Sequence, residues 1–254
     1  MDAYALPLQV YGAGLIFARV GALAMLIPGL GEQAVPPRVL LAFAFLFALV
    51  LYPIERAHLP PVPSSVGGIG AQIGIEILIG LAIGSLLRLF LGSLAVAGEI
   101  VSLQTTLSFA QTTNPLQAQP TTTVATFLTL LGLTMVFATD LHHLFIAAVA
   151  KSYTIFPPGR GVPVGEFGAL MMRAFSQTFL LGVQLAAPVI VFSLVFNIAA
   201  GFIGRVMPQF QVFFVATPLT VLLGLSVFAL SLGVFGLVWT DSFRDFIGRF
   251  VGGA

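Results

Sequence analysis

The strongest constraint in this sequence is a pair of long uncharged stretches near its carboxyl end. Residues 174–204 contain no charged residue, and neither do residues 206–240, so Arg205 alone divides them. A soluble protein connects its elements through polar surface loops, whereas about 20 apolar residues suffice to cross the hydrocarbon core of a bilayer. The pattern predicts a membrane protein in which these two stretches form a hairpin.

The composition of the whole chain also indicates a membrane protein. Hydrophobic residues make up 58% of the sequence and charged residues 7%, against about 25% charged residues in ordinary globular proteins. Backbone amides in lipid must be satisfied within each segment, so we expect helices, and the alternation of a β-barrel is absent. The fold class predicted is an all-α, polytopic membrane protein. Its six candidate segments are 8–27, 39–53, 69–91, 123–150, 174–203 and 212–239.

The second and third segments carry more specific expectations. Segment 39–53 covers only about 21 Å up to its proline, so we expect it to be buried among protein neighbours. In segment 69–91, small residues recur at the spacing that lets helices approach closely; they are Gly70, Gly74, Gly80 and Gly84. Glu76 and Arg88 would each cost about 3 kcal/mol at a bilayer centre, so we expect them near an end or facing protein.

Residues 99–126 are too polar for a lipid-facing helix and too apolar for a disordered linker. Irregular backbone at membrane depth survives when it is buried in protein or lines a water-filled path. The stretch therefore predicts a channel plug or constriction, since apolar side chains can close a pore by excluding water. Its candidate residues are Leu107, Phe109, Gln111, Asn114, Pro115 and Leu116. The alternative is a plain extramembrane loop.

The turn between the last two segments is a candidate docking point for another polypeptide. Gly204 ends one helix, Pro208 prevents the next from starting upstream, and Arg205 and Gln209 offer hydrogen bonds at the tip. The alternative is a simple solvated turn that the arginine anchors at the membrane interface.

Catalysis and cofactor binding are not expected. Asp140, His142 and His143 lie close in sequence, but adjacent helical side chains point about 100° apart, and the H-E-x-x-H zinc pattern is missing. An interfacial cluster is therefore favoured over a metal site. Nucleophile elbows, phosphate loops, cysteines and basic clusters are absent as well. We expect no enzyme, no cofactor, no metal and no nucleic-acid partner.

Four motifs in this order resemble the FliR family of flagellar export-gate proteins, which has virulence-secretion relatives. They are PGLGEQAVPPRVLLAFA at 28–44, SLQTTLSFAQTTNP at 102–115, DLHHLF at 140–145 and GRVMPQFQVFFVATPL at 204–219. The resemblance covers essentially the whole chain, 1–254, as a single helical subunit. It favours the flagellar branch.

The resemblance implies a subunit of the type III protein-export gate in the bacterial inner (cell) membrane, at the flagellar basal body. It implies a hetero-oligomer with FliP and FliQ, contacts with FlhB and FlhA, and passage of unfolded flagellar export substrates. Residues 1–150 would be FliP-like, with the plug at 105–120, and residues 174–239 a FliQ-like hairpin. The hairpin tip, 204–209, would lie on the cytoplasmic side. The family implies an external N-terminus, whereas the count of positive charges favours an internal one.

The rival interpretation is a small secondary transporter. Glu76, Arg88 and Asp140 would then bind an ion or solute at a broken helix. Such transporters are built from repeats, and the only internal repetition found is LLGL at 130–133 and again at 222–225.

Overall fold

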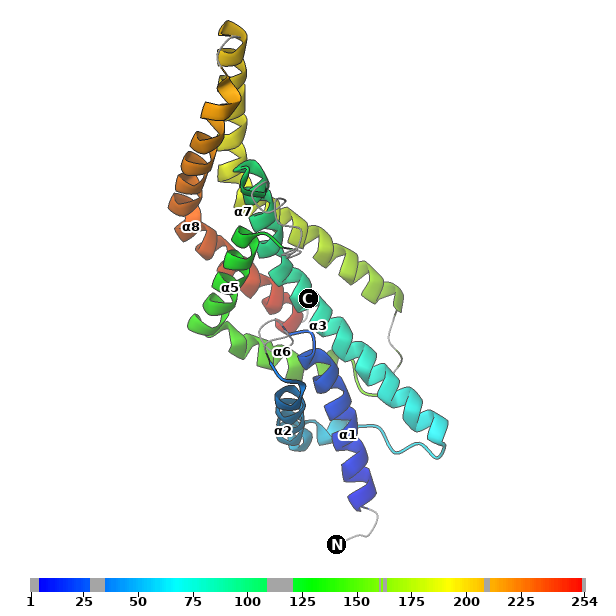
Figure 1. Ribbon diagram of the computed structural model, residues 1–254. Coiled ribbons are helices and arrows are strands. Elements are labelled where there is room, and N and C mark those ends of the chain that lie inside the picture. Colours follow the sequence, from blue (N-terminus) through cyan, green and yellow to red (C-terminus); the bar gives the residue numbers. More distant parts are fainter. Residues whose placement is uncertain are drawn as a thin grey trace. The chain divides into compact units, whose positions relative to one another are not determined.

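The computed structural model describes residues 5–27, 35–108, 121–159, 161, 164–207 and 211–252, and these ranges contain helices and turns but no β-strand (Figure 1). The elements are α1 (Ala5–Ala24), α2 (Pro37–Glu55), the 3-10 helix η1 (Arg56–His58), α3 (Val66–Gln104), α5 (Thr123–Ala138), α6 (Leu141–Ile155), α7 (Val164–Val206) and α8 (Val212–Gly252). Among the described residues, five helices are long and apolar enough to cross a membrane, and the bent pair α5–α6 makes a sixth if it counts as one span. The predicted all-α membrane fold is confirmed.

The chain divides into two compact units. Unit 1 comprises Met1–Phe90, Asp140–Phe175 and Arg244–Ala254, and unit 2 comprises Leu91–Thr139 and Ser176–Phe243. The long helices α3, α7 and α8 each contribute residues to both units.

In unit 1, helix α1 packs against α2 and α3. Its buried stripe recurs every three to four residues, as in an amphipathic helix, and consists of Leu15, Ile16, Arg19, Val20 and Leu23. Contact with α3 is closest at Gly80, where a Cβ would lie 2.2 Å from the backbone oxygen of Arg19. A glycine is therefore needed for the two backbones to approach this closely.

The core of unit 2 surrounds Trp239 of α8, which is fully buried. Its indole Nε1 donates a hydrogen bond to Ser93 Oγ of α3 at 3.3 Å. Helix α5 packs directly on this core. A Cβ at Gly132 of α5 would lie 2.0 Å from the Leu94 side chain and 3.7 Å from the Trp239 ring, so Gly132 contacts both.

Helices α7 and α8 form a hairpin that is largely uncovered by the chain itself. The two meet where a Cβ at Gly224 would lie 3.6 Å from the ring of Phe192. Within their apolar windows only 33% of α7 and 22% of α8 is buried. A surface this apolar requires lipid or partner subunits as its neighbour.

The segment expected at 123–150 is two helices, so that prediction is wrong. Helices α5 and α6 meet at a bend of 79°. Asp140 lies at the bend in the left-handed conformation, with φ of 57°. Aspartate is among the few side chains that tolerate this conformation, and it interrupts an apolar run that otherwise reads as one helix.

Segment 39–53 was expected to be too short to cross a bilayer, and that prediction is wrong. Helix α2 begins with Pro37 in its first turn, where proline is favoured, and continues through Pro53 to Glu55. Pro53 lies in the last turn and removes a single hydrogen bond there. The chain buries only 17% of the apolar window Pro37–His58, so its own residues leave most of α2 exposed.

Helix α3 extends beyond the predicted end at residue 91, as far as Gln104. Residues 99–104, which we expected to be irregular, are therefore helical. One reason is that residues 64–114 contain no proline to end the helix. A second is that Ser93 and Gly98 are small, which lets α3 pack closely against its neighbours in unit 2.

Candidate functional site

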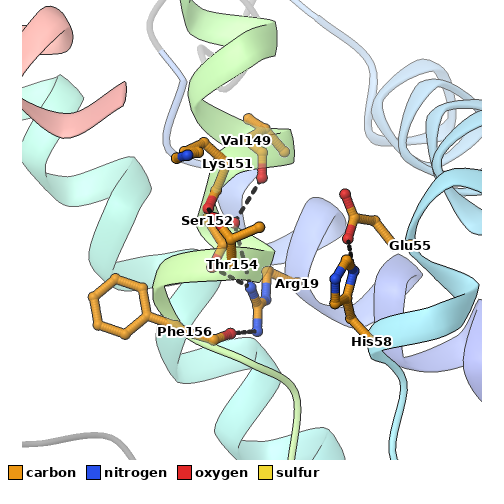
Figure 2. A network of polar contacts seen from close by, with 8 residues as sticks. All are labelled: Arg19, Glu55, His58, Val149, Lys151, Ser152, Thr154 and Phe156. Atoms are coloured by element: carbon orange, nitrogen blue, oxygen red, sulfur yellow. Dashed lines mark hydrogen bonds and ion pairs between the residues drawn. The ribbon is translucent and has the colours of Figure 1, made fainter. Parts of the chain in front are cut away.

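The most strongly buried polar cluster lies in unit 1 around Arg19 (Figure 2). Arg19 and Glu76 are both 0% exposed, and Arg19 Nε donates to Glu76 Oε2 at 2.6 Å. The pair joins α1 to α3 across 57 residues of sequence. Two buried charges are stable in such surroundings when they are paired and hydrogen-bonded.

Arg19 also binds the carboxyl end of α6. Its Nη1 donates to Ser152 O at 3.1 Å and to Ser152 Oγ at 3.3 Å, and its Nη2 donates to Phe156 O at 2.9 Å. The guanidinium carbon lies 4.2 Å from the centre of the Tyr153 ring. A cation at a helix C-terminus satisfies the last carbonyls and interacts favourably with the helix dipole.

The Arg19 cluster joins α1, α3 and α6 through the hydrogen bonds of one guanidinium group. Every nitrogen of the guanidinium contacts a partner, and arginine does not release its proton in proteins. Within the described ranges, Glu76 Oε1 and Tyr153 Oη have no hydrogen-bond partner. A second pair lies beside the cluster, where Glu55 Oε2 is 3.0 Å from His58 Nδ1 (Figure 2).

The pairing of Arg19 was not predicted from the sequence. The signal was present in the periodicity, because Arg19 lies in the same stripe as Leu15, Ile16 and Leu23. Glu76 precedes Gly80 by one turn, and that glycine contacts α1 at Arg19. Glu76 faces protein, which was one of the two positions expected for it.

The four glycines expected to mediate helix packing differ in their surroundings. A Cβ at Gly80 would meet Arg19 and Ala22 of α1, and a Cβ at Gly84 would lie 2.8 Å from Leu26. A Cβ at Gly70 or Gly74 would meet no atom of the described chain within 4 Å.

In unit 2, polar contacts fix the two ends of the loop between α3 and α5; we call these contacts the loop stem. At the start of the loop, Gln104 Oε1 accepts a hydrogen bond from Ser193 Oγ of α7 at 2.8 Å. Thr105 is fully buried and donates to Val101 O at 2.8 Å. Its methyl group would lie 2.6 Å from a Cβ at Gly224 of α8.

At the end of the loop, Glu99 Oε1 accepts from the backbone N–H of Thr122 at 2.8 Å. Thr122 then caps α5 by accepting from Ala125 N at 3.3 Å. A Cβ at Gly98 would lie 2.3 Å from Ala125 Cα, so α3 and the first turn of α5 are in backbone contact. The Glu99 carboxylate also lies at the N-terminus of α5, where a negative charge is favourable.

Most of the predicted plug residues lie outside the described part of the chain. Phe109, Gln111, Asn114, Pro115 and Leu116 belong to this group, and Leu107 is described as half-buried in a helical turn. The turn before it contains Thr106 at φ of 59°. A positive φ is unusual for threonine, whose branched side chain makes this conformation strained.

The predicted docking tip is described only in part. Gly204 and Arg205 lie in the last turn of α7, where Arg205 is exposed, while Pro208 and Gln209 lie outside the described residues. The transporter residues are not assembled into one site: Glu76 is paired with Arg19, Arg88 is exposed on α3, and Asp140 lies 3.8 Å from His143.

A family model described as bacterial export proteins, family 1, matches residues 10–246. The flagellar biosynthetic protein FliR of Caulobacter vibrioides is 60% identical over 250 residues, which cover 98% of this chain and 100% of that protein. FliR of Escherichia coli (strain K12) is 32% identical over 213 residues, 83% of this chain and 80% of that protein. The Yop proteins translocation protein T of Yersinia pestis is 27% identical over 216 residues, which cover 84% of this chain and 82% of that protein.

Proposed function

Because this chain belongs to the FliR family of flagellar biosynthetic proteins, within the bacterial export proteins of family 1, we propose that it forms and plugs the conduit of the flagellar type III export gate. The family resemblance drawn from the four sequence motifs is confirmed. The chain is thus a membrane protein of the flagellar export apparatus, with components of that apparatus as its partners. We propose that it acts without catalysis and that unfolded export substrates pass along it.

The observation that carries the plug proposal is the loop stem. The loop leaves α3 after Gln104, and Glu99 of the same helix holds the other end at Thr122, so the two ends lie about 8 Å apart along the helix. The contacts to Ser193 and Gly224 bring α7 and α8 to the same place. A loop held at both ends among long apolar helices can obstruct a path without any chemical step.

The uncovered apolar surface supports assembly with other subunits. Most of the α7–α8 hairpin and of α2 is exposed within this chain, and lipid or further protein must cover it. As the family resemblance implies, we propose FliP and FliQ as core partners, with FlhB and FlhA in contact. The location proposed is the bacterial inner membrane at the flagellar basal body.

The plug proposal is tested by removing Leu107–Gln117 from the chain in the assembled complex. We expect the complex to form in normal amounts and the membrane to become leaky to ions, because the obstruction is lost while the stem stays. Single-channel conductance in planar bilayers and ion flux into cells measure this. A Gly/Ser segment of the same length in place of 107–117 serves as the matched variant, since it keeps loop closure but lacks the apolar side chains. Unchanged conductance in a fully assembled complex would remove the plug from the proposal.

The transporter alternative receives no support from the arrangement of its residues. Its central carboxylate, Glu76, is occupied by Arg19. The other two groups proposed for it, Arg88 and Asp140, are exposed and belong to different helices or turns.

A further inference from the structure

A group of three potential metal ligands lies at the bend before α6, outside the Arg19 cluster and the loop stem. Asp140, His142 and His143 each offer one ligand atom, and these atoms all lie within 4.8 Å of one another. Adjacent histidines on a helix were expected to point too far apart to share an ion. Both lie in the first turn of α6, yet their imidazole ring centres are 4.2 Å apart.

The ligand atoms must move closer together to hold one ion. In the tetrahedral geometry that Zn²⁺ prefers, ligand atoms about 2.0–2.2 Å from the ion lie about 3.3–3.6 Å from each other. His143 Nδ1 and Asp140 Oδ1 are 3.8 Å apart, and their side chains are 69% and 80% exposed. These two exposed side chains are free to rotate toward the half-buried His142, which brings the three ligand atoms onto one ion.

Asp140 is placed for this role rather than for capping. It occupies the N-cap position of α6, yet its side chain makes no capping hydrogen bond, although aspartate is among the best capping residues. Its carboxylate faces His143 instead. Its positive φ also carries a conformational cost that its surroundings must offset.

We propose that Asp140, His142 and His143 bind one divalent transition-metal ion. Two imidazoles and one carboxylate suit ions such as Zn²⁺, Ni²⁺ and Co²⁺ and are poor ligands for Mg²⁺ or Ca²⁺, which prefer oxygen. Three protein ligands leave open positions that water fills. The ion joins the left-handed residue at the bend to the first turn of α6 and so stabilises the start of that helix.

Binding is tested on the full chain, purified in detergent, stripped with a chelator and titrated with ZnCl₂ by calorimetry. We expect saturation at one ion per chain and a higher unfolding temperature with zinc, because a ligand that binds the folded state stabilises it. Titration with CoCl₂ gives an independent measurement, since the visible absorption of Co²⁺ changes when protein ligands replace its water molecules. Mg²⁺ should not compete.

The three histidines of the chain provide a matched set of variants. His142→Gln and His143→Gln should each weaken zinc binding by about tenfold or more, since loss of even an outer-shell partner costs 10–100-fold. His58→Gln should bind as the wild type does, because His58 contacts Glu55 instead. Asp140→Asn keeps a residue that tolerates the left-handed conformation and should also weaken binding. Absence of saturable binding to the wild type, or equal binding by all four variants, would overturn the proposal.

Discussion

Arg19 is the residue of unit 1 whose side chain joins three helices, α1, α3 and α6. It pairs with Glu76 on α3 and with the last carbonyls of α6, and both charged side chains are withdrawn from solvent. Buried ion pairs contribute little net stability, but removal of one partner leaves the other charge buried and unpaired. The residue therefore fixes which surfaces of α1, α3 and α6 can face each other.

Replacement of Arg19 by methionine should strongly destabilise the chain. Glu76 would lose its partner, and the expected cost is about 3–5 kcal/mol. Thermal unfolding of the purified chain in detergent, followed by circular dichroism, measures this as a lowered midpoint. Arg88→Met is the control and should change little, because Arg88 is exposed on α3.

The double variant Arg19→Met/Glu76→Leu separates the effect of an unpaired charge from that of lost packing. Replacement of a buried pair by apolar residues of similar volume is often neutral or stabilising. We expect the double variant to recover much of the stability that Arg19→Met loses. A double variant no more stable than Arg19→Met would show that the hydrogen bonds to α6, rather than the unpaired carboxylate, carry the effect.

At the scale of elements, glycines of α3 decide how closely helices approach. A Cβ at Gly80 would overlap the backbone of α1 at 2.2 Å, whereas Gly74, on the same helix, has open space around it within the described chain. Backbone cannot move aside as a flexible side chain can, so the two positions should respond oppositely to the same substitution.

Gly80→Ala should destabilise the purified chain by about 1–3 kcal/mol, because the added methyl group overpacks the α1–α3 contact. Gly74→Ala should instead stabilise it by about 0.5–1 kcal/mol, since alanine loses less backbone entropy than glycine in a helix. Unfolding midpoints of the two single variants, measured side by side, provide the comparison. A Gly80→Ala chain that unfolds at the wild-type temperature would contradict the close approach.

At the scale of the whole molecule, the exposed apolar surface of the α7–α8 hairpin requires partners or lipid. Co-expression with the FliP- and FliQ-like proteins of the same organism, followed by gentle extraction and native mass spectrometry, tests the proposed assembly. We expect a discrete hetero-oligomer that contains this chain. A monomer or homo-oligomer that binds neither partner would contradict the proposal that the chain is a subunit of the gate.

Arg205→Glu should weaken association with the partner subunits more than it affects folding. The residue is exposed in the last turn of α7. A negative charge there is unfavourable with the helix dipole by only about 0.3–1 kcal/mol, so the effect on folding should be small. The amount of hetero-oligomer relative to free chain is the measurement. Arg173→Glu makes the same change at another exposed arginine of α7 and is the matched control. Equal complex from both variants would argue against docking at the hairpin tip.

The sequence by itself determined that the chain is helical, where most helices lie, and to which family it belongs. The physical reason is that lipid leaves the backbone few ways to satisfy its amides, so that long apolar runs become helices whatever their neighbours. The family followed from motifs in the right order over the whole chain. The predicted end of α2 at Pro53 was wrong, because Pro53 lies in the last turn and the helix continues through it to Glu55.

Only the tertiary structure decided which polar groups meet. Arg19 and Glu76 are 57 residues apart, and periodicity places each on a buried face without naming its partner. The contact between Glu99 and Thr122 depends likewise on how α5 returns to α3. The bend at Asp140 rests on a single left-handed residue within an apolar run, a backbone choice that hydrophobic pattern does not specify. Pairings and bends of this kind arise from packing between segments. The hydrophobic pattern of one segment shows which of its faces is buried and does not show which other segment will cover that face.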